Sequence, residues 1–105
     1  MGFFRPIASW QKDVGKYVDH QGFNRPRDME DVDLILSKLA LVHSEVSEAT
    51  EAARNKDREN FMEEIADVVI RCLDLADAMN FDLEESMRDK MEFNWTRPPK
   101  HGREA

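Results

Sequence analysis

Two acidic pairs are the residues of this sequence best suited to chemistry. Glu45 and Glu48 form an E-x-x-E pair, and Glu64 and Asp67 form an E-x-x-D pair further along the chain. Residues three apart on a helix lie one turn apart on the same face, so two neighbouring helices would gather four carboxylates into one cleft. Such oxygen ligands favour Mg²⁺ or Mn²⁺, and Mg²⁺ usually shares its shell with substrate phosphates. The spacing therefore predicts a divalent-metal site for a phosphorylated substrate.

The apolar residues around these acids predict that their carboxylates are partly buried. Projected at about 100° per residue, Glu45 falls inside an apolar arc, and Glu64 and Asp67 border a second arc. An unpaired buried carboxylate is costly, so we expect a cation beside these groups. The alternative interpretations are a solvated acidic face and an i, i+4 ion pair between Asp67 and Arg71.

Cations and aromatic rings supply candidates for substrate binding. Arginine holds phosphate oxygens with a planar fork, and lysine holds them as a point charge. Aromatic rings could form the wall of a substrate pocket, although Trp10 is expected more strongly in the core. The candidate substrate-binding residues are Lys38, Lys90, Asn94, Arg97, Trp10 and Phe23.

The elements that must position these residues are helical. No stretch shows a strand pattern, so we predict an all-α, four-helix bundle-like protomer with an irregular basic C-terminal tail. The expected caps are Asp28, Asp57 and Asp82. The four helices are expected at about residues 6–20, 29–55, 58–79 and 83–95.

The second predicted helix is long for a small domain. At a rise of about 1.5 Å per residue it spans about 40 Å, whereas a compact chain of this size has a radius of gyration of about 13 Å. We therefore expect an oligomer in which this helix extends into a partner subunit.

Composition limits the class of protein. A chain of 105 residues with 41% hydrophobic residues fits a single domain over residues 1–105. The net charge of -7 argues against a nucleic-acid partner. The single cysteine, Cys72, cannot form an internal disulfide, and no apolar run is long enough to cross a membrane. We expect a cytoplasmic protein with neither a membrane nor a nucleic-acid partner.

The order of these motifs resembles that of the MazG-like nucleotide pyrophosphohydrolases, within the all-α NTP pyrophosphatase superfamily. The resemblance rests on the four acids, on KLALVHSE before the first pair, and on KMEFN followed by an Arg97-Pro98 step. It covers roughly residues 7–103.

The resemblance implies hydrolysis of a nucleoside triphosphate between its α and β phosphates, with release of a monophosphate and pyrophosphate. It also implies Mg²⁺ bound by the four acids, which carry catalysis, and a homodimer or homotetramer. Family members often act on deoxy- or non-canonical nucleotides, and their usual interpretation is house-cleaning. Lys90, Asn94 and Arg97 match family positions near the substrate phosphates or sugar, whereas the aromatic loop after the first helix is represented only by Phe23.

Several alternatives stay open at this level. Sibling enzymes acting on dCTP, dUTP or phosphoribosyl-ATP would use the same acids, and a non-catalytic helical interaction module could retain the metal site. A di-iron bundle is disfavoured because it needs Glu-x-x-His on two helices, and the chain has none. Glu45 is expected either to bind the metal or to activate the attacking water, and the sequence does not separate these roles.

Overall fold

The structure is a computed structural model that describes residues 5–99. Within that range the chain forms helices and no strand, which confirms the predicted all-α class. The predicted basic tail residues from Lys100 onward lie outside the described residues. The four helices are α1 (Ile7–His20), α2 (Val32–Arg54), α3 (Arg58–Ala78) and α4 (Leu83–Trp95).

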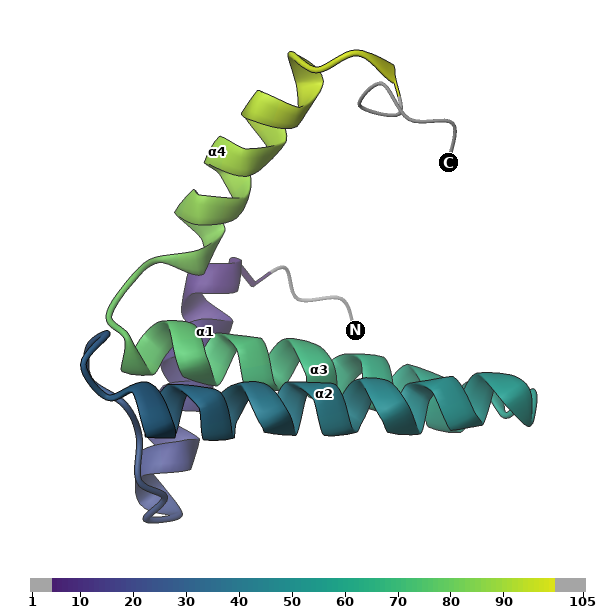
Figure 1. Ribbon diagram of the computed structural model, residues 1–105, viewed down its shortest axis with the longest axis horizontal. Helices are drawn as coiled ribbons and strands as arrows, with labels where there is room; N and C mark the ends of the chain where they lie inside the picture. Colours follow the sequence, from purple (N-terminus) through teal and green to yellow (C-terminus); the bar gives the residue numbers. More distant parts are fainter. Residues whose placement is uncertain (1–4, 100–105) are drawn as a thin grey trace.

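Helices α2 and α3 form the central pair of the fold. They run side by side in opposite directions, joined by a short turn in which Lys56 adopts a φ of 55° (Figure 1). The carboxylate of Asp57 accepts a hydrogen bond from the backbone N–H of Asn60 at 3.1 Å, and Asp82 does the same for Glu85 at 3.2 Å. These two predicted N-caps are confirmed, and they fix where α3 and α4 begin.

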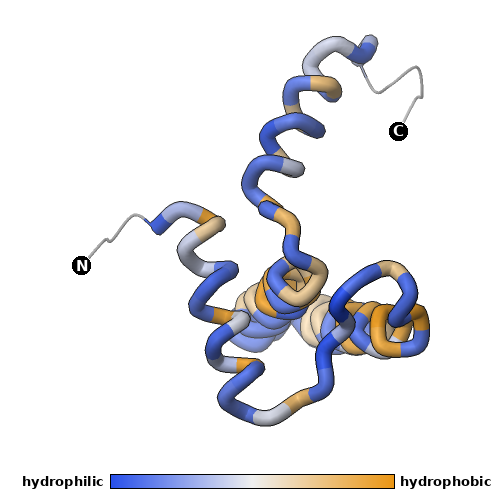
Figure 2. The backbone as a smooth tube through the Cα atoms, turned by 90° about the vertical axis from the view of Figure 1, so that its left-hand side faces the viewer, coloured by the Kyte–Doolittle hydropathy of each residue, from blue (hydrophilic) through white to orange (hydrophobic). Residues whose placement is uncertain are grey.

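Helix α1 packs across α3 and closes one side of the pair (Figure 2). Val14 and Val18 of α1 meet Leu73 of α3 in the buried core, with Ile7 and Leu83 at its border. The α1 sequence suits this contact because its apolar residues recur at helical spacing on one face. The core therefore lies between α1 and α3, close to where α2 supplies its acids.

Helix α4 leaves the other three helices rather than packing along them (Figures 1 and 2). Its start is held by the buried Gln11, whose side chain donates to Phe81 O at 2.7 Å and accepts from Leu83 N–H at 3.1 Å. None of the α4 residues is buried. The radius of gyration is accordingly 16.0 Å, larger than the roughly 13 Å of a compact chain of this length.

One predicted cap is wrong. The sequence suggested that Asp28 caps a helix from about residue 29, whereas α2 begins at Val32 after Asp31. Asp28 instead accepts from Glu30 N–H at 2.9 Å, and Asp31 accepts from Arg27 N–H at 2.7 Å. These local bonds between side chain and backbone stabilise a turn that competes with the helix.

Candidate functional site

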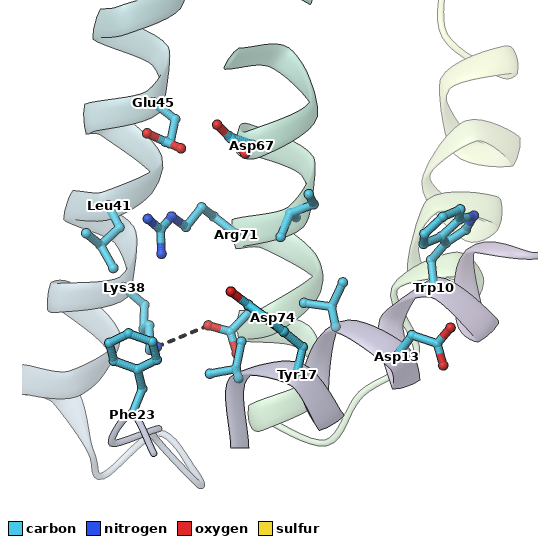
Figure 3. Close-up of a pocket in the computed structure, with 13 residues that line it drawn as sticks. Trp10, Asp13, Tyr17, Phe23, Lys38, Leu41, Glu45, Asp67, Arg71 and Asp74 are labelled. Carbon is cyan, nitrogen blue, oxygen red and sulfur yellow. Dashed lines mark ion pairs between the residues drawn. The ribbon is translucent and has the colours of Figure 1, made fainter. Parts of the chain in front are cut away.

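The acidic pairs of α2 and α3 converge. Carboxylate oxygens of Glu45, Glu48 and Glu64 all lie within 4.8 Å of one another. Asp67 follows Glu64 by one helical turn and faces Glu45 across the gap between the helices (Figure 3). Glu48 is exposed, Glu45 and Asp67 are half-buried, and Glu64 is buried. The antiparallel packing of α2 and α3 thus brings together the four acids that the sequence singled out.

The cluster carries more negative charge than its surroundings compensate. Contact with Glu48 and burial, followed by repulsion from Glu48, Glu45 and Asp67, raise the pKa of Glu64 to about 7. Burial and the Asp67 and Glu48 carboxylates also raise the pKa of Glu45, against the opposing charge of Arg71. Both shifts mean that the site favours an added positive charge, supplied by a proton or by a metal ion.

The donor set fits a hard divalent cation. Among the described residues, the buried Oε2 atom of Glu64 has no hydrogen-bond partner. Buried acceptors of this kind are rare because leaving one unsatisfied is costly. Oxygen ligands from Glu45, Glu48 and Glu64, with Asp67 beside them, suit Mg²⁺ or Mn²⁺ better than a softer metal.

A cavity of about 600 Å³ opens beside the acids, between α1, α2 and α3. Its lining includes Glu45 and Asp67 together with Trp10, Phe23 and Lys38, so three predicted substrate-binding residues share one space with two of the acids (Figure 3). The volume lies in the range typical of small-molecule sites. The acids lie at one end of the cavity, and the rings of Phe23 and Trp10 line opposite sides of it (Figure 3).

Trp10 does not lie in the core, where the sequence placed it. Its side chain is 48% exposed and forms part of the cavity wall. The guanidinium of Arg5 covers its ring at 4.0 Å from the centroid. The helical period of α1 correctly placed Trp10 on the side of Val14, but at the end of the helix that side faces the cavity.

Lys38 forms an ion pair inside the cavity. Its Nζ lies 3.1 Å from Asp74 Oδ2, and the ammonium also lies 5.7 Å from the centre of the Phe23 ring. The other oxygen of Asp74 accepts from Arg25 Nε at 3.0 Å, and Arg25 reaches Asp77 at 3.0 Å. Sequence reasoning missed this network, although Lys38 and Asp74 each lie two turns from an acid of the cluster.

The three remaining predicted residues lie on or just beyond α4, and none lines this cavity in a single chain. The cations of Lys90 and Arg97 lie 5.0 and 5.7 Å from the centre of the Phe93 ring. Asn94 is half-buried, and its side-chain amide lies 3.9 Å from the sulfur of Met91. The structure therefore separates the α4 candidates from the acids.

Arg71 is a cavity residue whose role sequence reasoning underestimated. The alternative interpretation paired it with Asp67, but among residues 5–99 it forms no ion pair within 4.0 Å. It lines the cavity instead, with its guanidinium directed toward α2 (Figure 3).

Comparison with family models gives one finding that bears on this geometry. A model described as the MazG-like family matches residues 36–105, two thirds of the chain, and the match includes all four acids and α4. Comparisons with curated proteins and with solved structures give no match. In residues 5–99, no helix has the length and apolar character needed to cross a membrane.

Proposed function

Because the chain belongs to the MazG-like family, we propose that it is a Mg²⁺-dependent nucleoside triphosphate pyrophosphohydrolase. The reaction cleaves a nucleoside or deoxynucleoside triphosphate between the α and β phosphates and yields a monophosphate and pyrophosphate. The observation that carries the proposal is the convergence of carboxylate oxygens from α2 and α3 within 4.8 Å beside a cavity of about 600 Å³. House-cleaning of deoxy- or non-canonical nucleotides is the role that we propose for the activity.

The position of each acid in the cluster suggests its role in the proposed reaction. Glu45, Glu48, Glu64 and Asp67 would hold the metal, which when bound polarises phosphoryl oxygens and lowers the pKa of water. Glu45 lies on the cavity side of the cluster, where its carboxylate can accept a proton from the attacking water.

The apolar part of the cavity would hold the nucleoside. Phe23 and Trp10 both line the cavity, and aromatic side chains bind nucleobases by stacking. Stacking tolerates any base, so the choice among canonical, modified, dCTP, dUTP and phosphoribosyl-ATP substrates must come from other contacts. A substrate panel distinguishes these siblings.

A second copy of the chain completes the proposed assembly. Helix α4 buries none of its residues, and Met87, Met91 and Trp95, spaced four apart on one face, are all exposed along it. Contiguous apolar surface of this kind marks protein interfaces. We propose a homodimer or homotetramer in which α4 is covered, which would also let Lys90, Asn94 and Arg97 approach a neighbouring copy's acids.

The test scores pyrophosphate against orthophosphate release from a panel of canonical and modified nucleoside triphosphates with Mg²⁺. Glu48→Gln and Asp67→Asn should abolish pyrophosphate release, while circular dichroism shows unchanged helicity. Glu63→Gln is the matched control, because Glu63 is exposed and adjacent to Glu64 but outside the cluster. Pyrophosphate release retained in both acid variants, or absent from the wild type on every nucleotide, would reject the proposal.

A further inference from the structure

Among residues 5–99, Arg71 is a cation of the cavity lining that forms no ion pair within 4.0 Å. It projects from α3 into the space shared by Glu45 and Asp67, and it is half-buried (Figure 3). Within the part of the chain that the structure describes, the other lysine or arginine of the lining, Lys38, is neutralised by Asp74 at 3.1 Å. Arg71 has no carboxylate within 4.0 Å in the same range. An incoming anion would therefore find its available positive charge at Arg71.

Its place along the cavity is intermediate. Arg71 follows Asp67 by four residues, so it lies one helical turn further from the acid cluster on the same face of α3. Across the gap it points between Glu45 and Lys38 of α2, on the way from the acids to the ring of Phe23 (Figure 3). A ligand that spans the cavity from the acids to Phe23 must pass this guanidinium.

We propose that Arg71 binds the α-phosphate of the nucleotide, an inference that rests on the proposed function. With the nucleoside against Phe23, the phosphate attached to it would lie between this ring and the acids, where Arg71 stands. A magnesium triphosphate is still anionic, and four carboxylates surround it. Arginine suits this position because its planar fork donates two parallel hydrogen bonds to phosphate oxygens.

The assignment replaces the role that the sequence gave to Lys38. A lysine whose ammonium is already paired with a buried carboxylate has less charge to offer a phosphate, whereas Arg71 forms no ion pair within 4.0 Å among the described residues. The α-phosphorus is also the atom attacked in the proposed reaction. Donors placed there stabilise charge that develops in the transition state, so Arg71 should contribute to kcat as well as to binding.

A purely structural role for Arg71 makes a different prediction. If Arg71 only compensated Glu45 and Asp67, its removal would change the charge of the acid cluster and so change the affinity of both products, which are held there through the metal, by a similar factor. If it contacts the α-phosphate, its removal should weaken the binding of the monophosphate product and leave the binding of pyrophosphate unchanged. The two products of one reaction therefore separate the two roles.

The experiment compares Arg71→Gln and Arg71→Lys with the wild type. Calorimetry with Mg²⁺ measures binding of the four deoxynucleoside 5′-monophosphates and of pyrophosphate, and turnover is measured separately as kcat and KM. Arg71→Gln should weaken monophosphate binding by about 10- to 100-fold, the usual range for hydrogen bonds to a charged group, and should lower kcat. Arg71→Lys should recover part of the loss, because it restores the charge without the fork. Pyrophosphate affinity should stay within about 2-fold.

Arg54→Gln is the matched control, since it removes the same charge from an arginine side chain that is 73% exposed on α2. Its binding and turnover should equal those of the wild type. Unchanged monophosphate binding in Arg71→Gln would overturn the inference, as would equal weakening of both products or a wild type that binds no monophosphate. Monophosphate binding that depends on Arg71 in a wild type without turnover would uphold the inference and reject only the proposed function.

Discussion

Lys38 Nζ lies 3.1 Å from Asp74 Oδ2, and the two residues are only 8% and 3% exposed. The second oxygen of Asp74 lies 3.0 Å from Arg25 Nε, so one buried carboxylate holds a cation from α2 and another from the loop after α1. That loop also carries Phe23, whose ring lies beside the Lys38 ammonium. Asp74 therefore fixes both the floor of the cavity and the segment that supplies one of its aromatic walls.

Replacement of Asp74 should be strongly destabilising. Asp74→Asn leaves Lys38 and Arg25 without their shared counter-charge, and breaking a buried pair in this way costs about 3 to 5 kcal/mol. Urea unfolding followed by circular dichroism measures the loss. Asp19→Asn removes another carboxylate partner of Arg25, but one that is 69% exposed; surface pairs contribute about 0 to 1 kcal/mol, so this control should be nearly neutral. Equal losses of unfolding free energy in the two variants would contradict the claim that Asp74 holds Lys38 and Arg25 in place.

Gly15 of α1 leaves room for the Asp77 side chain of α3. A Cβ atom at this position would overlap the Asp77 carboxylate, which also accepts from Arg25 at 3.0 Å. Gly15→Ala should therefore destabilise the fold by about 1 to 3 kcal/mol, the usual cost of overpacking. The Asp77→Ala background removes the clash, so the double variant should lose less than the sum of the single variants, by about 0.5 to 3 kcal/mol. Additive losses in urea unfolding would show that the Asp77 side chain is not what limits the space at Gly15.

The sequence predicts the helices and the acid cluster well because both follow from local spacing. Glu45 and Glu48 share a face of α2 whatever it packs against, and a short turn makes α3 its antiparallel neighbour. The Lys38–Asp74 pair is different, because it depends on the register of two helices across a gap that no local pattern reports. The predicted N-terminal boundary of α2 was wrong for a local reason, because Asp28 stabilises a turn.

The sequence pattern also could not predict the direction in which α4 leaves the other helices. Its amphipathic pattern predicts a helix that packs, but not whether it packs within its own chain or on another copy. The connection after α3 and its bonds to Gln11 set the outward direction. Those bonds join residues about 70 positions apart in the chain, so only the assembled fold reveals them.

The exposed face of α4 yields a prediction about assembly. Met91 is half-exposed in a single chain, so Met91→Lys would change the stability of a monomer by no more than about 0.5 kcal/mol. In the proposed oligomer it should instead dissociate the subunits, because an unpaired charge is poorly tolerated at an apolar contact. Size-exclusion chromatography with light scattering reads the mass directly. Asp89→Lys, on the opposite face of α4 from Met87, should leave the oligomer intact; a wild type that runs as a monomer would contradict the assembly.

Glu64 should make the metal-free protein less stable as the pH rises. Its pKa is about 7 in the folded state against an ordinary value of 4.5, chiefly because of its contact with Glu48 and its burial. Between these two values the folded chain holds a proton that the unfolded chain has released, so the free energy of unfolding falls as pH increases through this window. Thermal unfolding in EDTA from pH 4.5 to 8 measures the slope.

Glu64→Gln tests the source of that slope, because glutamine mimics the protonated acid and cannot titrate. The variant should be less sensitive to pH than the wild type, whereas Glu63→Gln should keep the full wild-type slope. Mg²⁺ should raise the wild-type melting temperature most above pH 7, where Glu64 is ionised, since a metal binds only the deprotonated ligand. Identical pH slopes for the wild type and Glu64→Gln would show that Glu64 does not cause the pH dependence, and Mg²⁺ stabilisation that is equal at pH 5 and pH 8 would show that Glu64 is not a metal ligand.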